Sequence, residues 1–313
     1  MYCEVNKSKY MVFNGLYIMK IIKVQFIFLF FCQFIFGQNE NKYAGFIKIQ
    51  DTLVIKYKIE FSESKGKISG FSYTDFGGEH ETKSKISGIY DKDNRRLSFK
   101  EVALIYTKSP VSMDDYDFCN IHLEPTRFKL GSDKLIGDFK GKFNDGTECI
   151  NGELAMNSIE RIVKRVSKFT NKVQNSKRIE DSIKEKVQNL KILDTLNLNI
   201  LKKSQITSIF SASQKLKIVI YDGGQEDGDI ITILQDGNII LSKYKILNSN
   251  KILEIPLNRK KTTITIVANA TGSIGSNTAV IEIVDNGNII KALTNLESGE
   301  KTQIDILNSD FKL

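Results

Sequence analysis

The sequence has no tryptophan, two histidines and four cysteines among its 313 residues. A Ser-His-Asp relay would need His80 or His122, and neither is accompanied by the turn that exposes a nucleophilic serine. A zinc site is disfavoured, because two histidines and the two cysteines beyond the N-terminal region make a poor ligand set. A nucleotide fingerprint is also missing, since Gly272-Ser273-Ile274-Gly275 lacks the flanking strand and helix that a phosphate-binding loop requires.

The absence of tryptophan also weighs against glycoside hydrolysis. Two pairs of neighbouring carboxylates, Glu226 with Asp227 and Asp114 with Asp115, have the chemistry of an acid and a base. Glycosidase clefts usually need a larger scaffold and aromatic platforms, however. We therefore predict no catalytic residues. An enzyme of unknown class is the alternative, and it would need a cleft that contains His80 or the loop of Glu226 and Asp227.

No apolar run reaches the roughly 20 residues that span a bilayer. The longest covers residues 24–37, follows two lysines and ends at a polar break, which predicts a secretory signal in residues 1–37. We expect the exported form to start at Met19 and cleavage to occur near Gly37. The mature protein is then extracellular, on the cell surface or periplasmic. Lipid attachment at Cys32 is the alternative, although bulky residues precede that cysteine.

Two cysteines, Cys119 and Cys149, remain after this presequence. An even pair in an oxidising compartment predicts one disulfide. It would close a loop of about 30 residues and stabilise the fold by about 3 kcal/mol in the chain-entropy picture. Two separate buried thiols are the alternative.

The positive charge is concentrated in one segment. The chain has a formal net charge of +8, and residues 157–209 hold 12 basic and five acidic side chains. The rest of the mature chain is slightly acidic. This distribution argues against nucleic-acid binding by the regions on either side.

Two regions alternate apolar and polar residues with a period of two, which predicts a mainly β fold. Residues 40–156 predict an N-terminal antiparallel meander of about eight strands, either a small barrel or a sandwich. Residues 210–313 predict a C-terminal β-sandwich. Within it, Asp236-Gly237 and Asn286-Gly287 predict tight hairpin turns. The mature length suffices for two domains with their own cores.

Residues 157–209 between these regions predict a basic, amphipathic helical linker. Apolar residues recur there at spacings of three and four, with Ser176 and Glu180 interrupting the row. One long helix, or a helix with a soft centre, follows from this pattern. It would form a stalk or a coiled-coil homodimer through residues 159–190, or pack back on one β-domain. Its basic face would be solvated or would touch anionic lipid or glycan. The row consists of Ile159, Ile162, Val166, Phe169, Val173, Ile183, Val187 and Leu190.

The densest polar cluster, residues 222–229, lies between two predicted strands. Carboxylates separated by glycines in a loop can surround Ca²⁺, which takes six to eight oxygen ligands. The polar loop at residues 269–278 would fold beside it and add oxygens. A solvated turn whose aspartates cap their own backbone is the alternative. The candidate calcium ligands are Asp222, Glu226, Asp227, Asp229, Asn269 and Asn277.

Stretches of both β-regions resemble known secreted domains. Residues 43–156 resemble a β-domain of uncharacterised secreted Bacteroidota proteins, through Gly70-Phe71-Ser72, residues 81–88 and Cys149-Ile150-Asn151-Gly152. That resemblance implies no function. The C-terminal region is similar to sandwich modules of the same group, and faintly resembles calcium-dependent carbohydrate-binding modules through Glu226-Asp227-Gly228-Asp229. The second resemblance implies a calcium-assisted sugar site, although the aromatic platform is missing unless a tyrosine supplies it.

The sequence therefore suggests a non-enzymatic binding or adhesion protein, with a surface glycan or a protein as its ligand. Calcium-dependent binding through the C-terminal sandwich is the leading hypothesis. A lipocalin-like carrier is the alternative, in which the N-terminal domain holds an apolar molecule in a lumen lined by Phe71, Tyr73, Phe99 and Tyr106.

Overall fold

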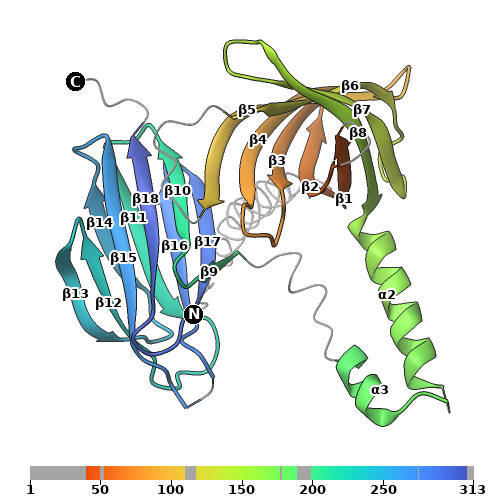
Figure 1. Cartoon of the computed structure of the whole chain (residues 1–313). Coiled ribbons are helices and arrows are strands. Elements are labelled where there is room, and N and C mark those ends of the chain that lie inside the picture. The colour runs from red at the N-terminus through yellow and green to blue at the C-terminus, as the bar shows by residue number, and fades with distance from the viewer. Residues whose placement is uncertain are drawn as a thin grey trace, which may run out of the picture. The chain divides into compact units, whose positions relative to one another are not determined.

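Eight strands with period-two alternation form an antiparallel barrel (Figure 1). Each strand pairs with its neighbour in the sequence, β1 pairs with β8, and β5 pairs with β6, so the sheet closes on itself. The prediction of a meander is confirmed, and of its two forms the barrel is correct. The strands are β1 Asn41–Ile49, β2 Leu53–Ser64, β3 Lys67–Thr74, β4 Thr82–Asp91, β5 Arg96–Ser109, β6 Asn120–Arg127, β7 Lys134–Lys142 and β8 Glu148–Ser158.

The computed structural model describes residues 40–49, 53–109, 118–176, 178–188, 199–273 and 275–308. Residues 40–313 belong to one compact unit. The predicted presequence, with its start at Met19, its cleavage near Gly37 and the alternative at Cys32, lies outside the described residues. So does the carboxylate pair Asp114 and Asp115.

Large apolar side chains fill the barrel. Tyr57, Ile59 and Leu97 have no exposed surface, and Tyr43 and Phe139 are each 1% exposed. Tyr43 and Phe61 stack with their ring centroids 6.1 Å apart, and Phe128 packs edge-on against Tyr43. Burial of this apolar surface is the main stabilising contribution to the domain.

Strand β5 belongs to two structures. Its first residues close the barrel against β6, with Lys100 opposite His122 as the last pair. Two register shifts against β4 then leave one extra residue each in β5, and such bulges bend a strand. The far end of β5 pairs with β10, Ile206–Ser211, where Tyr106 lies opposite Ile209. The barrel sheet therefore continues into the C-terminal strands.

Ten further strands form two sheets that share one core (Figure 1). Isoleucines of β12, β15 and β18 on one sheet meet those of β11, β16 and β17 on the other, as in a sandwich. Two of these strands begin before residue 210, the predicted start of the domain. The strands are β9 Ile200–Lys202, β10 Ile206–Ser211, β11 Lys215–Asp222, β12 Ile230–Gln235, β13 Asn238–Lys245, β14 Lys251–Pro256, β15 Lys261–Ala270, β16 Ala279–Asp285, β17 Asn288–Asn295 and β18 Lys301–Asn308.

Both predicted hairpin turns are present. Asp236 and Gly237 have φ of 49° and 83°, and Asn286 and Gly287 have φ of 43° and 86°. Two successive positive φ angles match the twist of paired strands, and Asp-Gly or Asn-Gly adopts them at the least steric cost. The turns fix the register of β12 with β13 and of β16 with β17.

The long helical linker is not supported. Helix α2 covers Ile159–Gln174 and α3 covers Asp181–Gln188. Asn175 is the C-cap of α2 and its N–H bonds back to the carbonyls of Asn171 and Val173, so α2 ends before the polar centre of the predicted helix. Leu190 and the rest of residues 189–198 lie outside the described part of the chain. Among the described helices, none is long and apolar enough to cross a membrane.

Cys119 and Cys149 form a disulfide, as predicted. Cys119 directly precedes β6 and Cys149 lies in β8, so the bond crosses β7, which lies between them. It passes over Gly141. A Cβ atom on this glycine would lie 2.5 Å from Sγ of Cys119 and 2.6 Å from Cγ1 of Ile150. The crossing therefore requires glycine at position 141.

Replacing both cysteines by alanine is expected to lower the free energy of unfolding by about 3 kcal/mol, because the unfolded chain regains the freedom that the bridged loop removes. Urea denaturation of the oxidised protein measures this. The matched control is wild type in reductant, whose midpoint should fall to that of the double variant. Equal midpoints for oxidised wild type and the variant would contradict the prediction.

Candidate functional site

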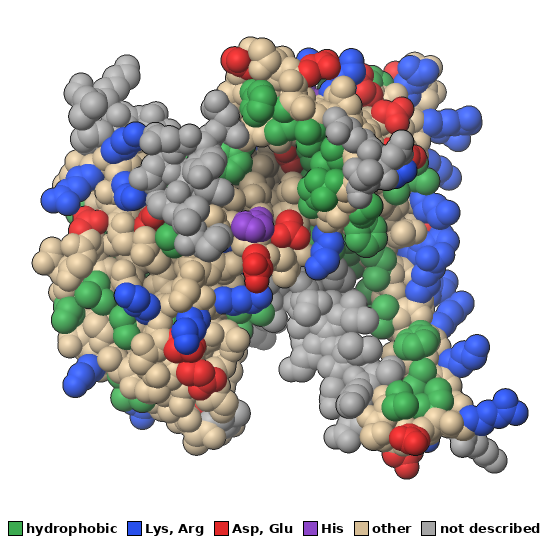
Figure 2. All heavy atoms as spheres, viewed as in Figure 1, with side chains coloured by type: hydrophobic (Ala, Val, Ile, Leu, Met, Phe, Trp, Pro, Cys, Tyr) green, Lys and Arg blue, Asp and Glu red, His purple; other side chains and the backbone are tan. Residues whose placement is uncertain are grey.

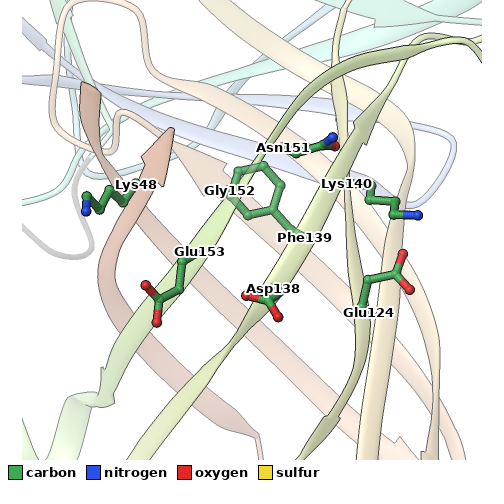
Figure 3. Close-up of a pocket in the computed structure, with 8 residues that line it drawn as sticks. All are labelled: Lys48, Glu124, Asp138, Phe139, Lys140, Asn151, Gly152 and Glu153. Carbon is green, nitrogen blue, oxygen red and sulfur yellow. The ribbon is translucent and has the colours of Figure 1, made fainter. Parts of the chain in front are cut away.

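The outer wall of the barrel carries an open groove of about 480 Å³ across β1, β6, β7 and β8 (Figure 3). Cross-strand pairing aligns its charged side chains in a row. Lys48 lies opposite Glu153, and Glu153 lies opposite Asp138. Glu124 of β6 completes the row, so that three carboxylates come from three neighbouring strands. All three are exposed.

A second row runs beside the first and carries amide and basic groups. Asn151 pairs with Lys140, Lys140 with His122, and His122 with Lys100. Beneath both rows, the ring of Phe139 lies against Gly152, where an added Cβ would come 2.8 Å from the ring (Figure 3). The ring is 1% exposed, so it forms the floor of the groove and offers no stacking surface.

A neighbouring groove of about 410 Å³ shares Glu124 with the first. It crosses β4, β5 and β6, and its wall combines His122 with the exposed apolar side chains of Ile89 and Pro125. Burial lowers the pKa of His122, and the positive charges of Lys142 and Lys100 lower it further. This histidine is therefore neutral near pH 7, and one ring nitrogen can accept a hydrogen bond.

The three carboxylates, Glu124, Asp138 and Glu153, have no hydrogen bond or ion pair in the described part of the chain, although the charge of Glu124 raises the pKa of His122. Like charges on directly opposed residues of neighbouring strands destabilise a sheet. The oxygens are thus free to accept hydrogen bonds from a bound molecule, and the arrangement costs stability without one.

A second polar cluster lies inside the barrel, at Glu101. Its Oε1 atom accepts from Tyr57 Oη at 3.0 Å and from Ser72 Oγ, and its Oε2 atom accepts from the Ile121 N–H at 2.8 Å. The β5–β6 ladder ends at the pair of Lys100 and His122, and Ile121 is the next residue of β6 beyond that pair. The carboxylate therefore replaces the missing ladder acceptor.

Burial dominates the electrostatics of this cluster. It raises the pKa of Glu101, and the three donors only partly offset that effect. Burial also raises the pKa of Tyr57 well above its ordinary value. The phenol therefore stays protonated and donates a hydrogen bond to Glu101. Tyr57 and Ser72 have no exposed surface. The cluster is buried, and its hydrogen bonds join β2, β3 and β6 to β5.

The predicted lumen residues divide between the two faces of the sheet. Phe99 belongs to the barrel core. Buried Ile59 pairs with Ser72, so the neighbouring Phe71 and Tyr73 lie on the outer face, and Tyr106 belongs to the core of the C-terminal sheets. The predicted lumen position is therefore wrong for Phe71, Tyr73 and Tyr106. The core residues of the barrel have little or no exposed surface.

The two predicted calcium loops lie against each other, as expected. Asp229, 2% exposed, accepts from the Gly272 N–H at 2.7 Å and from the Thr278 N–H at 2.8 Å. The Ser273 N–H bonds to the Asp227 carbonyl. These contacts fasten one loop to the other.

The other candidate ligands also bind protein groups. Asp222 accepts from the Gly224 N–H and Glu226 from the Asn248 N–H. Asn269 accepts from the Thr232 hydroxyl, and Asn277, fully buried, accepts from the Thr294 hydroxyl. In the described part of the chain, no three acidic, histidine or cysteine side chains are placed to hold a metal. Calcium binding at these loops stays a prediction.

His80 lies apart from His122, in the exposed turn between β3 and β4, where its backbone N–H bonds to Asp75. The nearby Glu81 is buried and accepts from Tyr106 Oη at 2.8 Å and forms an ion pair with Lys108 at 3.0 Å. This pair joins the β3–β4 turn to the far end of β5. The Thr82 hydroxyl donates to the backbone carbonyl of His80, but no hydrogen bond between described residues joins either imidazole ring to a nucleophile.

Replacing Glu101 by glutamine is expected to flatten the pH dependence of stability. Since the folded-state pKa of Glu101 is raised, its contribution is full below the unfolded carboxyl pKa of about 4.3 and is lost as the pH rises through the folded value. Wild type should therefore lose stability relative to Glu101→Gln as the pH rises above the unfolded carboxyl pKa of about 4.3. Urea denaturation across this range measures the difference.

Glu101→Leu is the matched comparison, because it leaves the Ile121 N–H without an acceptor. It should unfold about 1–3 kcal/mol more easily than Glu101→Gln at every pH. Equal stability of the two variants would show that the junction between β5 and β6 does not need this acceptor.

Sequence reasoning did not find the groove. Glu124, Asp138 and Glu153 lie on three successive strands, 14 and 15 residues apart in the sequence, and only the register of β6, β7 and β8 brings them together. A deliberate search for charged residues at polar positions of consecutive strands would have found them. Comparison with protein-family models, curated proteins and solved structures finds no match to this chain.

Proposed function

We propose that this chain is an exported, non-enzymatic binding protein that holds a neutral, polyhydroxylated ligand such as a glycan chain in the groove on its barrel wall. One observation carries the proposal. Three exposed carboxylates, which form no hydrogen bond or ion pair with another described residue, and a parallel row of amide and basic groups line two adjoining grooves.

The chemistry of the lining selects the ligand class. Carboxylate oxygens accept hydrogen bonds from hydroxyl groups, while lysine ammonium and Asn151 amide groups donate them. Acidic and basic side chains are nearly balanced along the two rows, which favours an uncharged polar ligand over a polyanion. The two volumes fall within the range of about 300–1,000 Å³ that small-molecule sites occupy. Their open form suits a chain that extends beyond the site.

Two further features support this proposal. The disulfide between Cys119 and Cys149 is the kind of bond that persists in oxidising, extracytoplasmic compartments. The filled barrel interior favours its surface over its lumen. A closed barrel is compatible with a carrier of apolar molecules, but such a carrier would have to displace core side chains.

Removing two of the carboxylates should weaken glycan binding. Retardation in native gels that contain soluble neutral polysaccharides, such as β-glucan, xylan and mannan, gives a dissociation constant for each. The double variant Asp138→Ala, Glu153→Ala should bind a retarding polysaccharide at least tenfold more weakly, because hydrogen bonds to charged groups are worth about 1.5–3 kcal/mol each.

Asp93→Ala is the matched control, since it removes an exposed carboxylate from the β4–β5 turn, outside the groove. It should bind like wild type. Absence of retardation by every polysaccharide, or equal retardation of wild type and double variant, would contradict the proposal.

The second candidate function is calcium-dependent ligand binding through the C-terminal loops. It is favoured by the contact between residues 222–229 and 269–278 through Asp229. Asp222 and Glu226 each use one carboxylate oxygen in the hydrogen bonds described above, which leaves the other for a cation. Calcium prefers such hard oxygen ligands.

If the loops bind calcium, millimolar Ca²⁺ should raise the melting temperature of the whole chain. A ligand at 100 times its dissociation constant stabilises the folded state by about 2.7 kcal/mol. Differential scanning calorimetry with Ca²⁺, with Mg²⁺ and with chelator measures the shift. The double variant Asp222→Asn, Glu226→Gln should lose most of it. An unchanged melting temperature for wild type would remove this candidate.

A further inference from the structure

Helix α2 projects from the barrel and is held mainly at its base (Figure 1). The Ser158 side chain accepts from the Arg161 N–H and caps the first turn. Arg161 also forms an ion pair with Asp133, 2.6 Å away, in the turn between β6 and β7. Of all residues in α2, which the structure describes in full, only Val173 is buried. Its remaining length has little packing against the barrel.

Helix α3 folds back on the far end of α2. The side-chain amide of Gln174 donates to the Lys184 carbonyl at 2.8 Å. Together α2 and α3 form a helical hairpin that exposes two large apolar side chains. Phe169 is 56% exposed and Ile183 is 48% exposed. Such exposure is unfavourable in water.

Basic side chains follow the same helix. Lys164, Arg165, Lys168 and Lys172 are exposed, and Glu160 is the only acidic residue in α2. Figure 2 shows these cations as a row along α2, with hydrophobic side chains exposed beside α3. Arg165 precedes Phe169 by four residues and Lys172 follows it by three, so both cations border the phenyl ring on the helix surface.

We infer that the hairpin of α2 and α3 docks on an anionic phospholipid surface. An amphipathic helix with lysine and arginine on one side and phenylalanine on the other lies in the interface of a bilayer. Its cations contact lipid phosphates and its apolar side chains enter the headgroup boundary. Each Lys or Arg near an anionic leaflet contributes to the attraction. The charge of α2 and its exposed Phe169 match both parts of such a surface.

A second copy of the chain fits this face less well. In a parallel pair joined through Ile162, Val166 and Phe169, the flanking positions of one helix would be Arg165 and Lys172. The facing positions on the second helix would be Val163 and Thr170. No carboxylate is available there to pair with the cations. Charge complementarity therefore selects the lipid surface.

Co-sedimentation of the whole protein with vesicles tests this inference. It should bind vesicles of 70% phosphatidylcholine and 30% phosphatidylglycerol, and bind pure phosphatidylcholine much more weakly. Replacing Lys164, Lys168 and Lys172 by glutamine should weaken binding about a hundredfold. Phe169→Ser should weaken it roughly tenfold or more.

The matched control replaces Lys65, Lys67 and Lys85 by glutamine, which removes three exposed charges from the barrel. It should bind like wild type. Equal binding to both kinds of vesicle would overturn the inference. So would loss of binding in the lysine variant with full retention in Phe169→Ser, which would indicate a polyanion site. A dimer in solution that Phe169→Ser dissociates would assign the face to a second copy.

Discussion

The hydrogen bond from the Ile121 N–H to Glu101 is the interaction on which the barrel depends. Strand β5 must close the barrel against β6 and then bend away to pair with β10. Where it departs, β6 loses its ladder partner, and a buried N–H without an acceptor would cost about 1–3 kcal/mol. The carboxylate supplies the acceptor at 2.8 Å. Burying this carboxyl group costs desolvation free energy, but without it the buried Ile121 N–H would have no acceptor at the junction between β5 and β6.

The groove depends on the same junction. Its floor consists of β6, β7 and β8, and β6 is held at this end by Glu101 on one side and by the disulfide to β8 on the other. Both fix how β6 lies against β7, which in turn fixes the spacing of Glu124, Asp138 and Glu153. Opposed carboxylates would push strands apart if the strands were free to move. A covalent crossing over Gly141 and a hydrogen-bonded seam resist that repulsion.

Local patterns in the sequence predicted the strands, the hairpin turns at Asp236-Gly237 and Asn286-Gly287, and the disulfide, because each depends on residues near one another or on a single pair. The sequence does not show which face of a strand is buried or which strands pair. A period of two says that Phe71 and Ser72 point to opposite sides, but only the register with Ile59 says which side is inside. Likewise, the apolar spacing from Ile159 to Val187 does not reveal that the helix ends at Gln174. That ending depends on a cap formed by Asn175.

The two proposed binding surfaces differ in net charge, and so they differ in the range of the forces that act on a ligand. The groove has nearly equal numbers of acidic and basic groups, so its contacts are short-range hydrogen bonds. Helix α2 has a clear excess of cations, and its attraction to a charged surface acts over a Debye length, about 8 Å at physiological salt. Added salt therefore weakens contact at α2 while leaving contact at the groove almost unchanged. A protein built this way can be held at a surface by one element and bind its ligand with another.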